Sequence, residues 1–138
     1  MKKALLSLIF ALVLSGCATQ IPPEVIANAD YGPPPPKNYQ ALVKSAFSHI
    51  LIDPTSPIYE FNSPRKGYIT HGTGDFYAGW LVCGEVNSKN RMGGYNGQLP
   101  FYALIYKNKV VAREIGEVPD NQYGISSLND AILAICNR

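Results

Sequence analysis

The beginning of the chain constrains the fold most, because it determines which residues fold and in which compartment they do so. Lys2 and Lys3 precede an apolar run from Ala4 to Leu14, and two small residues follow that run. A basic start, an apolar run of roughly 7–15 residues and small residues after it are typical of a secretory signal peptide, and the run is too short to span a bilayer. We therefore expect residues 1–16 to be a signal peptide that is removed on export.

The end of the apolar run carries a further signal. The residues Leu14-Ser15-Gly16-Cys17 resemble the lipobox of bacterial lipoproteins. This resemblance implies cleavage before Cys17, acylation of its thiol, and a stable anchor of several acyl chains such as palmitate. Residue 18 is alanine rather than the aspartate that retains such lipoproteins in the inner membrane, so the resemblance implies the periplasmic face of the outer membrane. The alternative is an ordinary signal peptide, with Cys17 as one more cysteine.

Length and charge limit what the exported chain can do. Removal of the signal leaves 122 residues, which is typical of one domain, with ten basic residues against ten acidic residues. A neutral chain lacks the basic surface that neutralises phosphate groups, so we expect no nucleic-acid partner. No second apolar stretch of about 18 residues follows the signal, so the lipid on Cys17 would be the only membrane anchor.

Two cysteines remain once Cys17 is acylated, and both would lie in an oxidising compartment. Cys83 and Cys136 have neither the spacing of metal ligands nor that of a C-x-x-C redox motif, although a metal pair and a redox couple are the functional alternatives. An even number of cysteines in an exported chain is typical of a disulfide framework. We therefore expect a structural disulfide between Cys83 and Cys136.

The segment after Cys17 is rich in proline. Residues 18–37 contain six of the eleven prolines, four of them in the run from Pro33 to Pro36. Because proline fixes φ and has no N–H group, this segment is expected to be an extended polyproline-II tether with a reach on the order of 60 Å. A single folded domain would then comprise residues 38–138.

Hydrophobic periodicity predicts the elements of that domain. An apolar stripe with the helical period runs over residues 38–52, with Asn38 as a plausible N-cap and Asp53-Pro54 as the stop, and a second stripe runs over residues 127–136. Between them the period is that of strands, which are expected at residues 58–62, 66–71, 76–87, 99–107 and 110–115.

The order of these elements predicts an α+β fold: an N-terminal helix, an antiparallel meander of about five strands, and a C-terminal helix. We expect both helices to cover one face of the meander, with Cys136 pointing into the core toward Cys83 on the central strand. The alternative is a small barrel whose ends are plugged by the helices. A two-residue turn at Asn108-Lys109 is expected to join the last two strands.

One motif lies between the third and fourth predicted strands. The residues that compose it are Val86, Asn87, Lys89, Asn90, Gly93, Gly94, Tyr95 and Gly97. They resemble a motif, V-N-x-K-N-x-x-G-G-Y-x-G, of an uncharacterised family of small bacterial exported proteins and lipoproteins. The residues Asp53-Pro54, which precede the first predicted strand, also resemble sequences of this family. The resemblance implies that the chain is related to these proteins, but it implies no activity, because the family has no established one.

Two interpretations of this stretch are open. In the structural one, residues 87–97 form an ordered hairpin connection whose glycines allow positive φ and whose asparagines bond their own backbone. In the functional one, the stretch is a binding loop that offers donors, two positive charges and a stacking ring to a carboxylate- or sugar-bearing partner. The candidate binding residues are Asn87, Lys89, Asn90, Arg91 and Tyr95.

The sequence carries no recognisable catalytic motif, and its only histidines are His49 and His71. We therefore predict no catalytic residues, no metal site and no cofactor. The predicted function is that of a non-enzymatic outer-membrane lipoprotein that presents a small periplasmic interaction module to an envelope protein. The alternative is a small-ligand or glycan binder, including an inhibitor of cell-wall-degrading enzymes.

Overall fold

The computed structural model describes residues 20–72 and 74–138. Within these ranges, no helix combines the length and the apolar character needed to cross a membrane. The predicted signal peptide and the lipid attachment at Cys17 lie outside the described residues. The elements follow in the order α1 (Pro23–Ala27), α2 (Tyr39–Ser48), β1 (Ile58–Phe61), β2 (Arg65–Thr70), β3 (Phe76–Asn87), β4 (Leu99–Tyr106), β5 (Lys109–Ile115) and α3 (Ser127–Cys136).

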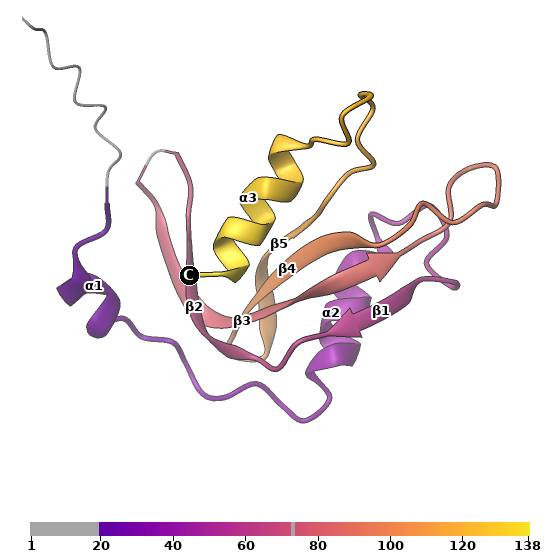
Figure 1. Ribbon diagram of the computed structural model, residues 1–138. Coiled ribbons are helices and arrows are strands. Elements are labelled where there is room, and N and C mark those ends of the chain that lie inside the picture. Colours follow the sequence, from indigo (N-terminus) through magenta and orange to yellow (C-terminus); the bar gives the residue numbers. More distant parts are fainter. Residues whose placement is uncertain (1–19, 73) are drawn as a thin grey trace, which may run out of the picture.

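The predicted α+β fold is confirmed: helix α2, a five-stranded antiparallel sheet and helix α3 follow one another (Figure 1). β3 is the central strand. It pairs with β4 on one side, and β4 pairs with β5. On its other side β3 pairs with β1 along its second half and with β2 along its first half. The chain therefore does not reverse its direction between β1 and β2, which follow one another along the same edge of β3 and are both antiparallel to it.

The expectation that both helices cover one face of the sheet is wrong. Val43 and Phe47 of α2 pack in one core cluster with Val82, Val86, Phe101, Ala103 and Ile105. Ile132 of α3 packs in a second cluster with Ile69, Leu81, Cys83, Tyr102 and Leu104. Because successive strand residues point to opposite faces, these two clusters lie on opposite sides of the sheet. The middle strands are apolar on both faces, so each face is shielded from water by a helix of its own, α2 on one side and α3 on the other.

Helix α2 is shorter than predicted, whereas α3 spans the predicted residues. α2 ends at Ser48, so Ile50 and Ile52 lie beyond it and are 51% and 60% exposed. Asn38 stands at its N-cap position but makes no capping hydrogen bond through its side chain. α3 is capped by Ser126, whose hydroxyl accepts a hydrogen bond from Asn129 N at 3.2 Å.

The last hairpin turn is displaced by one residue. Lys107 and Asn108 have positive φ angles of 48° and 61°, and β5 begins at Lys109. Positive φ at both central residues is the signature of a type I′ turn, whose twist suits two adjacent antiparallel strands. The turn is therefore Lys107-Asn108 rather than Asn108-Lys109.

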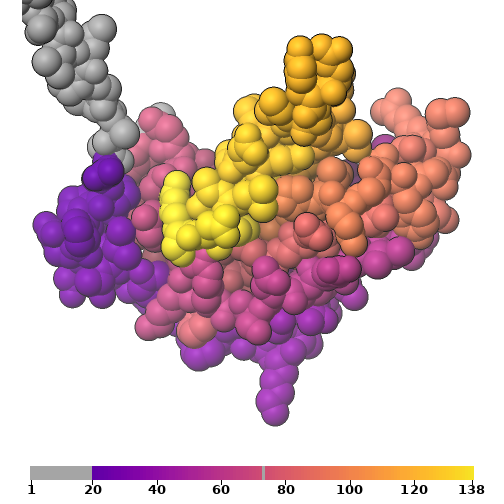
Figure 2. All heavy atoms as spheres, viewed as in Figure 1, coloured from indigo at the N-terminus to yellow at the C-terminus, as the bar shows by residue number. Residues whose placement is uncertain are grey.

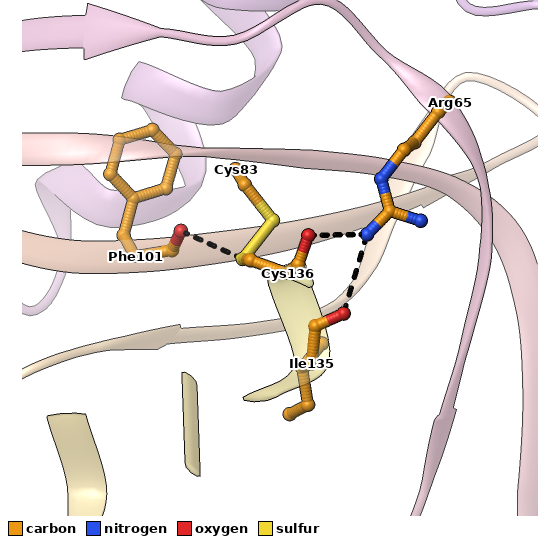
Figure 3. The surroundings of a disulfide bond; sticks show 5 residues. All are labelled: Arg65, Cys83, Phe101, Ile135 and Cys136. Atoms are coloured by element: carbon orange, nitrogen blue, oxygen red, sulfur yellow. Dashed lines mark hydrogen bonds between the residues drawn. A yellow bond between two sulfur atoms is a disulfide. The ribbon is translucent and has the colours of Figure 1, made fainter. Parts of the chain in front are cut away.

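The predicted disulfide between Cys83 and Cys136 is confirmed, with an S–S distance of 2.02 Å. It joins the central strand to the last turn of α3 (Figure 3). Arg65 of β2 secures the same helix end, because its Nη2 donates hydrogen bonds to the carbonyl oxygens of Cys136 at 2.6 Å and Ile135 at 3.4 Å. A cation at a helix C-terminus also interacts favourably with the helix dipole.

The expectation of an extended polyproline tether is wrong for residues 23–27, which form α1. Pro23 is compatible with the first turn of a helix because the N–H group that it lacks would have no partner there. Beyond α1 the chain bonds to the sheet. Tyr106 donates a hydrogen bond to Asp30 Oδ2 at 2.7 Å, and the indole N–H of Trp80 donates to Gly32 O at 3.4 Å. Figure 2 shows this N-terminal segment, in indigo, lying directly against the strands.

A glycine is required where this segment meets the sheet. Gly32 has a φ of +67°, and a Cβ atom placed on it would come within 3.1 Å of the Tyr106 ring. The adjacent carboxylate of Asp30 is stabilised by the hydrogen bond from Tyr106 and by a second bond from Gly32 N, and these bonds lower its pKa. The docking of residues 30–32 on the sheet thus depends on side chains from two strands.

Candidate functional site

The motif identified in the sequence lies on the connection between β3 and β4, at the end of the molecule opposite α1 (Figure 1). Its two asparagines bond the backbone of the loop itself. Asn87 Oδ1 accepts a hydrogen bond from Gly97 N at 2.9 Å. Asn90 Oδ1 accepts two, from Met92 N at 2.9 Å and from Gly94 N at 3.1 Å. Both amide side chains are thereby engaged in holding the loop, as the structural interpretation of the stretch expects.

Backbone geometry gives the loop its shape. Gly93 and Gly97 have φ angles of +82° and +92°, which residues other than glycine rarely adopt. The φ angle of Gly94 is not positive. Lys89 and Tyr95 face one another as an isolated antiparallel bridge. The residues at the base of the loop therefore continue the pairing of the sheet for a short distance.

The loop contacts the turn that precedes β1. Tyr95 donates a hydrogen bond from its hydroxyl to Ser56 O at 3.1 Å, and Lys89 Nζ lies 5.5 Å from the centre of the Tyr95 ring. Asp53 organises the turn, because its carboxylate accepts hydrogen bonds from the Ser56 hydroxyl and from the hydroxyl and N–H of Thr55. These bonds, with a smaller effect of the nearby Lys89 charge, lower the pKa of Asp53 to about 2. Asp53-Pro54 and the glycine-rich motif, distant in sequence, thus meet in space.

A groove of about 300 Å³ lies beside the loop. Its walls are the residues that follow α2, the base of the loop, and the end of β5 with the residues after it. Three large apolar side chains on its walls are about half exposed or more: Ile50, Ile52 and Val118. At the tip of the loop, Arg91 is exposed and Met92 is 96% exposed.

This groove was not predicted from the sequence. The helical stripe assigned Ile50 to the packed face of a helix, and the structure places it beyond the end of α2. Of the five predicted binding residues, Lys89 alone lines the groove, and Asn87, Asn90 and Tyr95 hold the loop in place. Arg91 lies with Met92 at the tip. In the sequence, a methionine beside an arginine within the glycine-rich stretch points to the tip of the loop, whereas no pattern points to the groove.

The arrangement offers few groups for chemistry. Over residues 20–72 and 74–138, no three His, Cys, Asp or Glu side chains gather where they could hold a metal ion. Glu60 and Glu85 stand opposite one another on β1 and β3, and Gln98, at the end of the loop, donates a side-chain hydrogen bond to Glu60 at 3.3 Å. The loop and the groove can present a firm, partly apolar surface to another molecule.

Comparison with known proteins adds no relative: no protein-family model, no curated protein and no solved structure matches the chain. The similarity of the loop motif to small exported proteins, and that of the N-terminus to lipoprotein signals, therefore stay predictions. The class that the structure itself defines is a disulfide-linked α+β domain with a sheet between two helices.

Proposed function

We propose that the protein is a non-enzymatic lipoprotein of the outer membrane, whose domain serves in the periplasm as an interaction module for another envelope protein. The lipid on Cys17 would hold the chain at the membrane, as the lipobox-like sequence implies. The loop and its groove lie at the end of the domain opposite α1, and hence opposite the side from which the anchor would come (Figure 1).

One observation carries the proposal of a protein partner: within the described residues of the loop, the side chains at the tip that take no part in holding it are those of Arg91 and Met92. Met92 is 96% exposed at the tip, and Ile50, Ile52 and Val118 are exposed in the groove at the base of the same loop. Flexible methionine side chains and arginine are enriched in protein–protein interfaces, where apolar side chains gather in the centre. Exposed apolar groups gathered at one end of a small domain favour a contact surface for protein.

The alternative, a glycan binder, has less support. A sugar site requires a ring that is free to stack and several polar groups that converge on the ligand. The Tyr95 hydroxyl donates to Ser56 O, and the Lys89 ammonium group lies over its ring. Asn87 and Asn90 bond the backbone of the loop. The groups that would recognise a sugar are thus occupied, and we favour the protein partner.

The anchor is tested by mass spectrometry of membrane fractions. In the unaltered protein, the N-terminal peptide is expected to begin at Cys17 and to carry the mass of several acyl chains. Cys17→Ala is expected to abolish both the acylation and the processing, because the thiol is the acceptor of the lipid. An unmodified chain recovered in the soluble fraction would contradict the proposal of a lipoprotein.

The interaction surface is tested by placing a photo-reactive amino acid at position 92 of the full chain in cells. A discrete cross-linked product with one envelope protein is expected, and the same substitution at Val111, which is exposed on β5, serves as the matched control. Ile52→Asp is expected to reduce the product about tenfold, since burial of one isoleucine contributes roughly 1.5–3 kcal/mol. Equal products from positions 92 and 111, or none from either, would contradict the proposed surface.

A further inference from the structure

A second pocket lies at the other end of the molecule, between the N-terminal segment, β2 and the end of α3. It has a volume of about 210 Å³. Three cations line it, Arg65, Lys66 and Arg138, and no aspartate or glutamate is among the described residues of its walls. In a chain whose exported part has equal numbers of acidic and basic residues, this is a local concentration of positive charge.

Aromatic rings hold two of these cations in place. Lys66 Nζ lies 5.4 Å from the centre of the Tyr31 ring, and the guanidinium carbon of Arg138 lies 5.6 Å from that of Tyr68. Such cation–π contacts restrict the side chains without neutralising their charge. Arg65 adds a third positive charge at the end of α3, where its Nη2 is bonded to two carbonyl oxygens. The pocket therefore offers positive charge to an anion.

The docking of the N-terminal segment determines what such a pocket would face. Because α1 begins at Pro23, five residues separate a lipid on Cys17 from the folded part of the chain. At no more than about 3.6 Å per residue, these residues allow a distance of about 20 Å at most between Cys17 and α1. An extended tether over residues 18–37 would instead allow a distance on the order of 60 Å. Ile26 of α1 is itself part of the wall of the pocket. An anchored domain would thus hold this pocket close to the lipid headgroups.

We propose that this basic pocket, which we define by Tyr31, Arg65, Lys66, Tyr68 and Arg138, binds the phosphate of anionic phospholipid headgroups and orients the anchored domain on the membrane. The proposal rests on the proposed lipid anchor. Tyrosine rings beside apolar and cationic groups suit the interface between headgroups and acyl chains, where each lysine or arginine contributes about 1 kcal/mol on an anionic surface. Val25, which is 43% exposed on α1, adds an apolar contact on the same segment.

The test uses the chain from residue 17 onward with Cys17→Ala, so that the result does not depend on acylation. Sedimentation is compared with vesicles of pure phosphatidylcholine and with vesicles that contain phosphatidylglycerol, at low and high salt. Stronger binding to the anionic vesicles is expected, and it should fall at high salt because surface charges are screened. Lys66→Gln with Arg138→Gln is expected to weaken this binding roughly 25-fold, or about fivefold for each cation.

The matched control is Lys44→Gln with Lys109→Gln, which removes two cations from α2 and β5; Lys44 also lies over aromatic rings, those of Tyr59 and Phe61. This control should bind like the unaltered chain. An equal loss in both double variants, or none in either, would overturn the proposal. The proposal would also be overturned if inorganic phosphate, in the absence of vesicles, bound the chain saturably and as tightly as the anionic vesicles do. Mass spectrometry of the Cys17 peptide separates failure of the anchor from failure of the pocket.

Discussion

Removal of the disulfide is expected to lower the free energy of unfolding by about 4 kcal/mol, the largest effect of any change considered for this protein. Cys83 and Cys136 are 53 residues apart, and chain-entropy arithmetic gives that figure for a loop of this length. Domains of this size unfold with only about 5–15 kcal/mol. The variant Cys83→Ala with Cys136→Ala should therefore melt roughly 15 °C lower in a thermal denaturation experiment.

Reduction provides the control for this prediction. A reducing agent should lower the melting temperature of the unaltered protein by a similar amount, because it breaks the same link between β3 and α3. It should have no effect on the double variant. A melting temperature that is the same with and without reductant would show that the disulfide does not stabilise the domain.

Loss of the N-terminal segment is expected to destabilise the domain by roughly 2 kcal/mol. A chain that begins at Lys37 lacks the bond from Trp80 to Gly32 O, which contributes about 1 kcal/mol, and it uncovers apolar parts of Trp80 and Tyr106. About 40 Å² of such surface contributes about 1 kcal/mol more. The measurement is urea denaturation of this chain against one that begins at Gln20. Trp80 is the only tryptophan, so its emission should shift to longer wavelength in the shorter chain.

A point substitution tests the same docking in the complete chain. Gly32→Ala should produce a smaller loss of stability and a similar shift of the Trp80 emission, since alanine is strained at a φ of +67° and would press on the Tyr106 ring. The matched control is Gly72→Ala, where a Cβ atom would meet no atom within 4 Å. If the chains that begin at Gln20 and Lys37 unfold alike, the segment is only a tether, as its prolines first suggested.

The sequence by itself determined most of the secondary structure. The strand period located β3 without error and the other strands to within about a residue at their ends, because alternation of apolar side chains is a local property that one segment reveals alone. The same reasoning placed Cys136 on the inner side of the last helix, where it meets Cys83. For the two asparagines of the loop, the sequence left a structural and a binding role open, and the structure shows both of them bonded to the backbone of the loop.

Only the tertiary structure decided which surfaces meet. β3 is apolar on both faces, so its sequence could not tell whether α2 and α3 share one face or take one each. The proline-rich segment has no periodicity, and its place on the sheet depends on Trp80 and Tyr106, far along the chain. The turn at Asp53 meets the loop through one hydrogen bond from Tyr95. Contacts of this kind leave no pattern within one segment, because their free energy arises only when distant residues are brought together.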